Sequence, residues 1–413
     1  MYFLHLDFGC REEYTFCEKR MPRGGRLEID MSCEALFATI DSLYEKYVGF
    51  LADVCNIESP TSDKAGVDAV GRYFAEAAHQ RGWLVERFPH PTAGDVVSVT
   101  MNAQAKGAPI TLSGHMDTVH PHGLFGTPPV RIEGDKLYGP GAIDCKGGIV
   151  AAFYAMDALC AVGFTDRPVR LLLQSDEEGG SKASGKATIR YMCEKAADSA
   201  AFINLEPFGD GRICVQRKGI VTFRFAVTGK EAHASQCARA GANAIAEAAH
   251  KILEMEKLKD NEGLTCSVGV IRGGSVPNTV AGYCEFYANV RYATQAQYEE
   301  VVAYAKRVAE TVHVDGCTCE VTESGSRPCM ERTERNLALA EKINGIFTAN
   351  GLPTLAPAFN LGGSDAAEIT AAGIPCVDSL GTSGGGIHSA DEWTSLTSLA
   401  EAAKRLAAIV YCF

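Results

Sequence analysis

The sequence predicts a two-domain α/β protein, in which a mixed sheet with flanking helices is interrupted by a smaller α+β domain. Over residues 83–215, short apolar runs alternate with segments of helical period, which is typical of a sheet covered by helices. Residues 216–325 follow the order β-α-β-β-α-β of the ferredoxin-like fold. Residues 326–413 return to the α/β pattern. The larger domain is therefore expected to be built from two pieces, 33–215 and 326–413.

The first piece is preceded by residues 1–32, which show no periodicity and are expected to form a loose N-terminal extension. Apolar residues then recur at spacings of three and four over 36–54, which predicts an amphipathic helix. A second helix is expected over about 65–81, ending before Gly82. The other elements expected in this piece are strands 95–102, 109–113, 168–174 and 200–205 and a helix over 146–162.

The inserted segment is long enough to fold as a unit of its own. Its expected elements are strand 219–228, helix 241–258, strands 265–272 and 279–292, helix 295–312 and strand 317–323. In the last piece, we expect helices over 334–350 and 396–411, and another opened by residues 362–365.

Composition excludes several classes of protein. The 413 residues carry 39 Lys+Arg against 51 Asp+Glu, a net charge of −12, which argues against a nucleic-acid surface. No apolar run is long enough for a transmembrane span, and the N-terminus lacks the features of a secretory signal. The 16 cysteines are scattered without a C-x-x-C pair, which favours reduced, buried thiols. We therefore expect a cytoplasmic protein that binds neither nucleic acid nor membranes.

Histidines and carboxylates gather where predicted strands or glycine-rich loops end, which is where α/β proteins place their sites. Each one alone has an ordinary structural explanation, such as a charged loop, a turn former or a satisfied polar residue. Together they match the nitrogen and oxygen ligands of a site for two metal ions. The residues concerned are His115, Asp117, Asp144, Glu177, Glu178, Glu206 and His388.

The motifs around these residues resemble one known enzyme group. They read S-G-H-M-D-T-V, G-P-G-A-I-D-C-K-G-G, D-E-E-G, L-E-P, G-K-E-A-H-A-S and G-I-H-S in chain order. This set resembles the co-catalytic zinc peptidase superfamily of aminoacylase, acetylornithine deacetylase, succinyl-diaminopimelate desuccinylase, peptidase T and carboxypeptidase G. The resemblance covers about residues 34–413. The stretches N-V-R-Y (289–292) and S-L-G (379–381) are most similar to the glutamate carboxypeptidase branch.

The resemblance implies two zinc ions per subunit, with cobalt or manganese as alternatives. His115, Asp144 and Glu206 would hold one ion, and Asp144, Glu178 and His388 the other. Asp144 would bridge the two ions, which lie about 3.5–4 Å apart in such sites.

By the same resemblance, Asp117 orients and polarises the imidazole of His115. Glu177 is the general base, which takes a proton from the attacking water and passes it to the leaving amine. Adjacent residues at a strand end point in different directions, so Glu178 can ligate a metal while Glu177 faces the water.

The smaller domain would serve as a lid and as the interface of a homodimer. The resemblance implies that His233 reaches into the partner subunit's site and stabilises the oxyanion, with support from Asn278. Arg291 resembles the clamp for the substrate α-carboxylate, a task that suits the planar guanidinium. Lys218 is the next candidate for this clamp.

Some positions depart from the family pattern or lie beside it. Cys145 stands where Met is frequent, and we expect a packing role for it. Asn289 stands where many relatives have Asp before the x-Arg pair. His120 and His122 are expected to be rim residues, because the ligand set is already complete.

The function that follows is zinc-dependent hydrolysis of an amide bond, releasing a free amino acid from a peptide or N-acyl amino acid with a free carboxylate. A glutamate carboxypeptidase is preferred, and an N-acyl-amino-acid deacylase of the aminoacylase or acetylornithine deacetylase type is the alternative. A binding protein that kept the fold without activity is a third hypothesis. It is disfavoured because Glu177 and every expected ligand are present.

Overall fold

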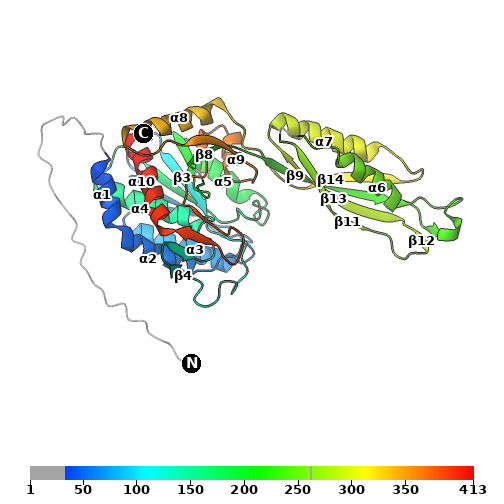
Figure 1. The fold of residues 1–413 in the computed structure, drawn as a ribbon, viewed down its shortest axis with the longest axis horizontal. Helices are drawn as coiled ribbons and strands as arrows, with labels where there is room; N and C mark the ends of the chain where they lie inside the picture. Colours follow the sequence, from blue (N-terminus) through cyan, green and yellow to red (C-terminus); the bar gives the residue numbers. More distant parts are fainter. Residues whose placement is uncertain (1–32, 210, 261–262) are drawn as a thin grey trace, which may run out of the picture. The chain divides into compact units, whose positions relative to one another are not determined.

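A computed structural model describes residues 33–209, 211–260 and 263–413 (Figure 1). The extension expected over 1–32 lies outside the described residues. None of the helices in the described ranges combines the length and the apolar character needed to cross a bilayer.

A six-stranded mixed sheet forms the centre of the main unit. Its neighbouring strands are, in order, β1 (Leu84–Phe88), β2 (Val96–Met101), β6 (Val169–Gln174), β3 (Ile110–His115), β7 (Ala201–Asn204) and β16 (Cys376–Val377). The last four run parallel to one another, whereas β1 and β2 are antiparallel to their neighbours. Because β16 comes from the C-terminal piece, segments on both sides of the insertion share one sheet. This arrangement confirms the predicted α/β class.

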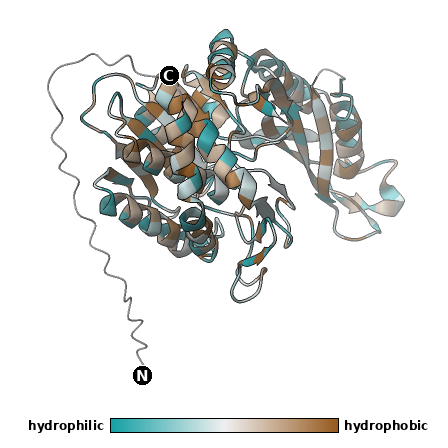
Figure 2. Cartoon of the chain, turned by 60° about the vertical axis from the view of Figure 1, so that its left-hand side comes forward, coloured by the Kyte–Doolittle hydropathy of each residue, from teal (hydrophilic) through white to brown (hydrophobic). Residues whose placement is uncertain are grey.

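Helices flank the sheet and bury their apolar faces (Figure 2). The segment α4 (Lys146–Ala161) is buried along most of its length and lies beside α10 (Leu396–Cys412). The single helix expected over 36–54 is two helices, α1 (Glu34–Ser42) and α2 (Tyr44–Cys55), which meet at Leu43. The remaining helices of this unit are α3 (Lys64–Gln80), α5 (Ala187–Ala196), α8 (Glu334–Ala349) and α9 (Ala366–Ala371).

Short strands that sequence patterns did not predict form two small sheets at the edge of the main unit. One pairs β8 (Arg212–Arg217) in parallel with β15 (Ala356–Asn360). The other has the strand order β17 (Gly384–Gly385), β18 (Trp393–Ser395), β5 (Lys136–Tyr138) and β4 (Arg131–Glu133). The second sheet brings the turn that carries His388 beside the loop that carries Asp144.

The inserted unit, residues 219–327, contains a four-stranded antiparallel sheet covered by helices on one face. Its strands lie in the order β11 (Thr265–Gly273), β13 (Tyr283–Tyr292), β9 (Gly219–Thr228) and β14 (Thr318–Arg327). The covering helices are α6 (Ala244–Met255) and α7 (Gln295–Glu310). The chain order of these elements is β-α-β-β-α-β, as the sequence pattern indicates. The strand expected over 279–292 divides into β12 (Thr279–Val280) and β13, and β12 pairs instead with β10 (Ala232–His233).

Burial alternates along β9, because one face of this sheet meets the helices and the other does not. Val221, Phe223 and Phe225 are buried in the core of the unit. Ile220 and Thr222 lie on the open face. The open face is therefore the one that can present side chains to a ligand.

Candidate metal centre and active site

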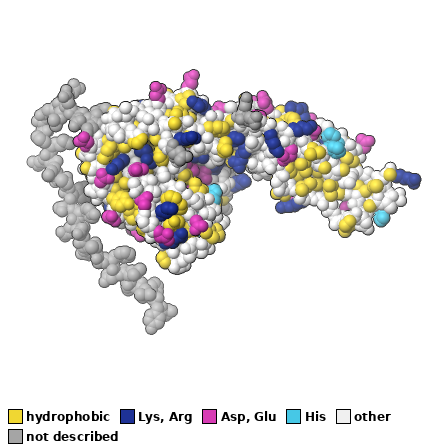
Figure 3. Space-filling model, viewed as in Figure 1, with side chains coloured by type: hydrophobic (Ala, Val, Ile, Leu, Met, Phe, Trp, Pro, Cys, Tyr) yellow, Lys and Arg dark blue, Asp and Glu magenta, His cyan; other side chains and the backbone are white. Residues whose placement is uncertain are grey.

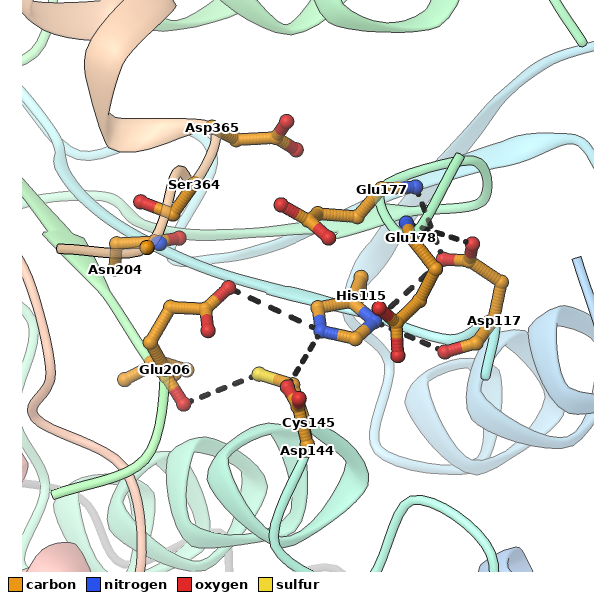
Figure 4. Close-up of polar contacts among 12 residues, drawn as sticks. His115, Asp117, Asp144, Cys145, Glu177, Glu178, Asn204, Glu206, Ser364 and Asp365 are labelled. Carbon is orange, nitrogen blue, oxygen red and sulfur yellow. Dashed lines mark hydrogen bonds and ion pairs between the residues drawn. The ribbon is translucent and has the colours of Figure 1, made fainter. Parts of the chain in front are cut away.

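The candidate site is built at the carboxyl ends of three parallel strands (Figure 4). His115 is the last residue of β3, Glu177 and Glu178 follow β6, and Glu206 follows β7. The carboxyl ends of parallel strands meet at one edge of a sheet, which is where ligands bind in α/β folds. Asp144 joins them from the loop that leads into α4.

One group of possible metal ligands contains His115, Asp144 and Glu206, whose donor atoms lie within 4.8 Å of one another. Nε2 of His115 is 3.0 Å from Oδ1 of Asp144 and 3.9 Å from Oε1 of Glu206. All three residues are buried. This is the first of the two ligand sets that the resemblance implied.

The second group contains Asp144, Glu178 and His388. Nε2 of His388 is 3.3 Å from Oδ2 of Asp144 and 3.3 Å from Oε2 of Glu178. Asp144 thus offers one carboxylate oxygen to each group. The structure brings all five predicted ligands together, with Asp144 in the shared position.

The electrostatics of these residues fit a divalent cation. Burial and the negative charge of Asp144 raise the pKa of Glu206 well above its ordinary value. Burial also raises the pKa of Glu178, whose buried Oε1 has no hydrogen-bond partner in the part of the chain that the structure describes. Hydrogen bonds with Asp144 and Glu178 raise the pKa of His388 to about 10. A cation bound among these groups would offset the repulsion between their carboxylates. Imidazole and carboxylate are the ligands that zinc takes in catalytic sites.

The side chain of Asp117 holds the turn after β6 in place through hydrogen bonds. Its carboxylate accepts hydrogen bonds from the backbone N–H groups of Glu177 and Glu178, both at 3.1 Å, and from Oγ1 of Thr61 at 2.8 Å. Its backbone carbonyl lies 2.9 Å from Nδ1 of His115, whereas its carboxylate is 3.5 Å from that nitrogen. Burial acts to raise the pKa of Asp117, but its hydrogen-bond partners outweigh burial and lower it. Asp117 is therefore placed to orient His115 and the two glutamates together.

Glu177 is held by Arg327, a residue that the sequence analysis missed. Nη1 of Arg327 lies 2.5 Å from Oε1 of Glu177, and its Nη2 donates to the Glu177 carbonyl at 2.8 Å. Oδ1 of Asp365 lies 3.6 Å from the same Nη2. Burial and the charge of Glu177 raise the pKa of Asp365 to about 8. The missed signal was the length of β14, which runs four residues past the predicted end at residue 323 and so carries Arg327 to the site.

Arg291 and Arg327 share one face of the inserted sheet. Ile220 of β9 is the register partner of Arg291 on β13 and of Arg327 on β14. Register partners in neighbouring strands point to the same side of a sheet. Nε of Arg291 donates to Oδ1 of Asn289 at 3.1 Å, and burial lowers the pKa of Arg291.

Beside this face, a pocket of about 200 Å³ extends to the metal-ligand residues. Glu177 and Glu178 line it from the main unit, and Ile220, Thr222 and Arg327 line it from the inserted unit. Arg291 is not among the lining residues, so the structure does not place the predicted clamp in contact with this pocket.

His233 and Asn278 lie together in the β10–β12 ribbon, where the backbone N–H of Ala234 donates to the Asn278 carbonyl at 2.8 Å. His233 is exposed, and its Nδ1 is 2.8 Å from Oγ of Ser235. Within the ranges that the structure describes, neither side chain forms a hydrogen bond or ion pair with the predicted metal ligands. The structure thus does not join them to the site of their own subunit.

The two extra histidines differ in their surroundings. His122 is exposed, and its Nε2 lies 3.0 Å from Oδ2 of Asp63 and its Nδ1 3.4 Å from Oε2 of Glu58. His120 is only 3% exposed, so the prediction that it is a rim residue is wrong. Its ring packs edge-on against Phe125, and its Nε2 lies 3.2 Å from Oε2 of the buried Glu392.

Cys145 packs beneath the ligands. It is buried, and its thiol donates to the Leu205 carbonyl at 3.1 Å. Burial raises its pKa well above the ordinary thiol value, which disfavours the reactive thiolate. A side chain at Gly114 would meet this sulfur and Ile149, so only glycine fits beside it. These contacts agree with the expected packing role.

Comparison with known proteins identifies the family. Residues 111–411 match the model of peptidase family M20/M25/M40. The chain is 29% identical to carboxypeptidase G2 of Pseudomonas sp. over 347 residues, 82% of each chain. It is 27% identical to succinyl-diaminopimelate desuccinylase of Wolinella succinogenes over 320 residues, 71% of this chain and 81% of that one.

Solved structures show the same fold. An aminopeptidase from Bacillus cereus superposes with a TM-score of 0.73 at 22% identity, covering 89% of this chain and 98% of its own. An M20 family metallo-carboxypeptidase from Sulfolobus solfataricus superposes with a TM-score of 0.68 at 16% identity, covering 88% and 98%. With most of the chain matched by the family model, this protein belongs to peptidase family M20/M25/M40 and is a metallohydrolase.

Proposed function

We propose that this chain hydrolyses an amide bond to release a free amino acid, with two divalent ions, preferably zinc, held by the two ligand groups. One observation carries the proposal. Asp144 offers a separate oxygen to each group, and Glu177 stands at the same sheet edge next to the ligand Glu178. Two metals flanked by a carboxylate that belongs to neither ligand group are the parts that hydrolysis of an unactivated amide requires.

The ions would supply a water of lowered pKa and polarise the scissile carbonyl. Glu177 takes the proton from the attacking water and passes it to the leaving amine. Arg327 holds Glu177 through its side chain and its carbonyl, so the carboxylate is oriented before substrate arrives. Asp117 fixes the backbone beneath both glutamates.

The proposed substrate has a free carboxylate on the released amino acid, as for a carboxypeptidase. The open face of the inserted sheet supports this, because it presents Arg291 and Arg327 in line. With a net charge of −12, the protein as a whole repels anions, so a local cation is needed to bind one. Arg291 is the proposed clamp because its guanidinium has no carboxylate partner among the described residues, whereas Arg327 is engaged by Glu177.

An N-acyl-amino-acid deacylase is the alternative, and the likeness to a succinyl-diaminopimelate desuccinylase favours it. The two reactions share their chemistry and differ in the acyl part of the substrate.

We further propose a homodimer formed through the inserted unit, with His233 and Asn278 completing the partner's site. Two features support it. The strand β11 is an edge strand, which leaves backbone groups open to pairing. Around it, large apolar side chains are exposed, among them Val270, Ile271, Val276 and Leu253. Elsewhere, Figure 3 shows Lys and Arg interspersed with Asp and Glu on the face in view.

The test is a metal and substrate panel. Apoprotein is reloaded with Zn²⁺, Co²⁺ or Mn²⁺ and assayed for amino-acid release from C-terminal Glu and Asp dipeptides, folylglutamate analogues and N-acetyl amino acids. Metal-dependent release from the dipeptides or folylglutamates supports the carboxypeptidase, and release from N-acetyl amino acids alone supports the deacylase. No release from any of them with two bound ions would contradict the proposal.

A further inference from the structure

Asp144 and His388 are distant in sequence, yet one buried residue contacts the segments that carry both. That residue is Glu392, which is 0% exposed and directly precedes β18. We propose that Glu392 is a positioning residue that sets the affinity of the second metal group. This inference rests on the proposed function, because it assumes that Asp144, Glu178 and His388 hold an ion.

The side chain of Glu392 holds the backbone of the shared ligand. Its Oε1 accepts hydrogen bonds from the N–H groups of Ile143 at 3.1 Å and Asp144 at 3.2 Å. These N–H groups lie in the irregular loop before α4, so no helix or sheet partner is available to them. A buried N–H without an acceptor is costly, and its backbone would turn to find one. Glu392 therefore determines the direction in which Asp144 leaves the loop.

The backbone of Glu392 ties the same loop to the turn that carries His388. Its carbonyl accepts from the N–H of Gly139 at 3.1 Å, and its own N–H donates to the carbonyl of Ser389 at 3.3 Å. Ser389 follows His388 directly, and His388 itself has a positive φ of 62° in this turn. One residue thus sets the spacing between two of the three ligands of the second group.

The other carboxylate oxygen of Glu392 contributes less to holding this side chain in place. Oε2 of Glu392 lies 3.2 Å from Nε2 of His120, but neither atom is satisfied by a well-formed hydrogen bond. The two backbone N–H groups are therefore what holds the carboxylate in place. From this we infer that an acceptor oxygen, and not the negative charge, is the property that matters at position 392.

The experiment separates the acceptor oxygen from the negative charge at position 392. Glu392→Gln keeps an oxygen that can accept from both N–H groups, whereas Glu392→Ala removes it. Glu392→Met removes it while filling nearly the same volume, so it separates the lost acceptor from a cavity. Glu341→Gln, at an exposed position on α8, is the matched control.

The readout is the binding of Co²⁺ and Zn²⁺ by apoprotein, measured by chelator competition and by elemental analysis, with unfolding curves of each variant. Loss of a residue that orients a ligand typically weakens metal binding ~10–100-fold. We expect that loss for the second ion in Glu392→Ala and Glu392→Met, with a smaller change for the first ion. Glu392→Gln and Glu341→Gln should stay within about threefold of wild type.

A double-mutant cycle assigns the effect to the second group. Because His388→Ala already removes a ligand of that group, adding Glu392→Ala should cause much less than the loss seen alone. Wild-type binding of both ions in Glu392→Met would overturn the inference. An equal loss of affinity for the second ion in Glu392→Gln and Glu392→Met would overturn it as well. A wild-type protein that binds fewer than two ions would instead contradict the proposed function, and the inference with it.

Discussion

At the scale of single residues, adjacent side chains at one strand end are expected to do different work. Glu178 faces His388 and Asp144, whereas Glu177 faces Arg327. The resemblance implied this division, whose roles stay a prediction, because the motifs keep the ligands next to recognisable glycines and strand ends. It did not predict Arg327 or Glu392, because each acts through contacts with residues far away in the chain. A contact of that kind leaves no local spacing to recognise.

The first prediction separates Glu177 from the ligands. Glu177→Gln keeps the shape and the hydrogen bond with Arg327 but accepts no proton, so kcat should fall by ~10²–10⁴ or more. Elemental analysis should still find both ions bound. Loss of an ion from this variant would make Glu177 a ligand and overturn the assignment. Glu341→Gln serves again as the exposed control.

The second prediction concerns the substrate carboxylate. Arg291→Ala should lose ~2–5 kcal/mol of transition-state binding for a substrate with a free α-carboxylate. Arg291→Lys should also be impaired, because it keeps the charge without the planar pair of donors. The measurement is kcat/KM for each substrate and for its α-amide.

Wild type should reject the amide strongly, and Arg291→Ala should barely distinguish acid from amide. If the variant keeps the wild-type preference, Arg291 is not the clamp. Arg327 would then be the next residue to test, because it lies on the same face and lines the pocket, with Lys218 after it.

At the scale of elements, the spacing of apolar residues located the long helices and strands but not the points at which they are interrupted. The break at Leu43 between α1 and α2 falls inside an unbroken apolar pattern, so only tertiary packing decides it. Strands of two or three residues, such as β16 and β17, are too short to show a period. The extension of β14 to Arg327 passes through Gly325 at an irregularity in register, which sequence patterns read as an end.

The third prediction tests a buried ion pair within α6 whose lysine also contacts the end of α7. Lys251 on α6 lies 2.9 Å from Oε1 of Glu247 and donates to three carbonyls at the end of α7 and just beyond it. Lys251→Met should destabilise the protein by about 3–5 kcal/mol, because it leaves the buried Glu247 carboxylate without its cation, with only the N–H groups of His313 and Val314 as donors. Urea unfolding measures the change. Lys257→Met, at an exposed pair near the end of the same helix, should barely move the midpoint.

A small shift of the unfolding midpoint in Lys251→Met would contradict this prediction. If Lys251→Met and Lys257→Met shift the midpoint equally, the carbonyls at the end of α7 are satisfied by water and the buried pair does not hold α6 to α7. A second variant, Glu247→Gln with Lys251→Met, removes both charges and should recover part of the loss.

At the scale of the whole molecule, one chain contributes two pieces to the central sheet and one insertion to a separate sheet. Sequence order predicted this arrangement, since the α/β pattern stops at the insertion and resumes after it. Assembly of subunits lies outside what such patterns determine, because an interface depends on exposed faces rather than on periodicity. The exposed apolar residues around β11 became visible only in the structure.

The last prediction tests that assembly through the site. If His233 acts in the partner's site, His233→Ala should lower kcat by ~10²–10³ with less effect on KM, as for one lost oxyanion donor. The resemblance implies this action in trans, and it is consistent with the exposed position of His233, which has no bond to the metal ligands of its own subunit among the described residues. Mixing inactive His233→Ala with inactive Glu177→Gln should form heterodimers, in which one of the two sites has an intact Glu177 and receives an intact His233. Activity should return after subunit exchange, and mass spectrometry can verify that exchange has occurred. Exchange without recovery would place His233 in its own subunit's site or outside the reaction, and the role of the inserted unit would then be dimer formation alone.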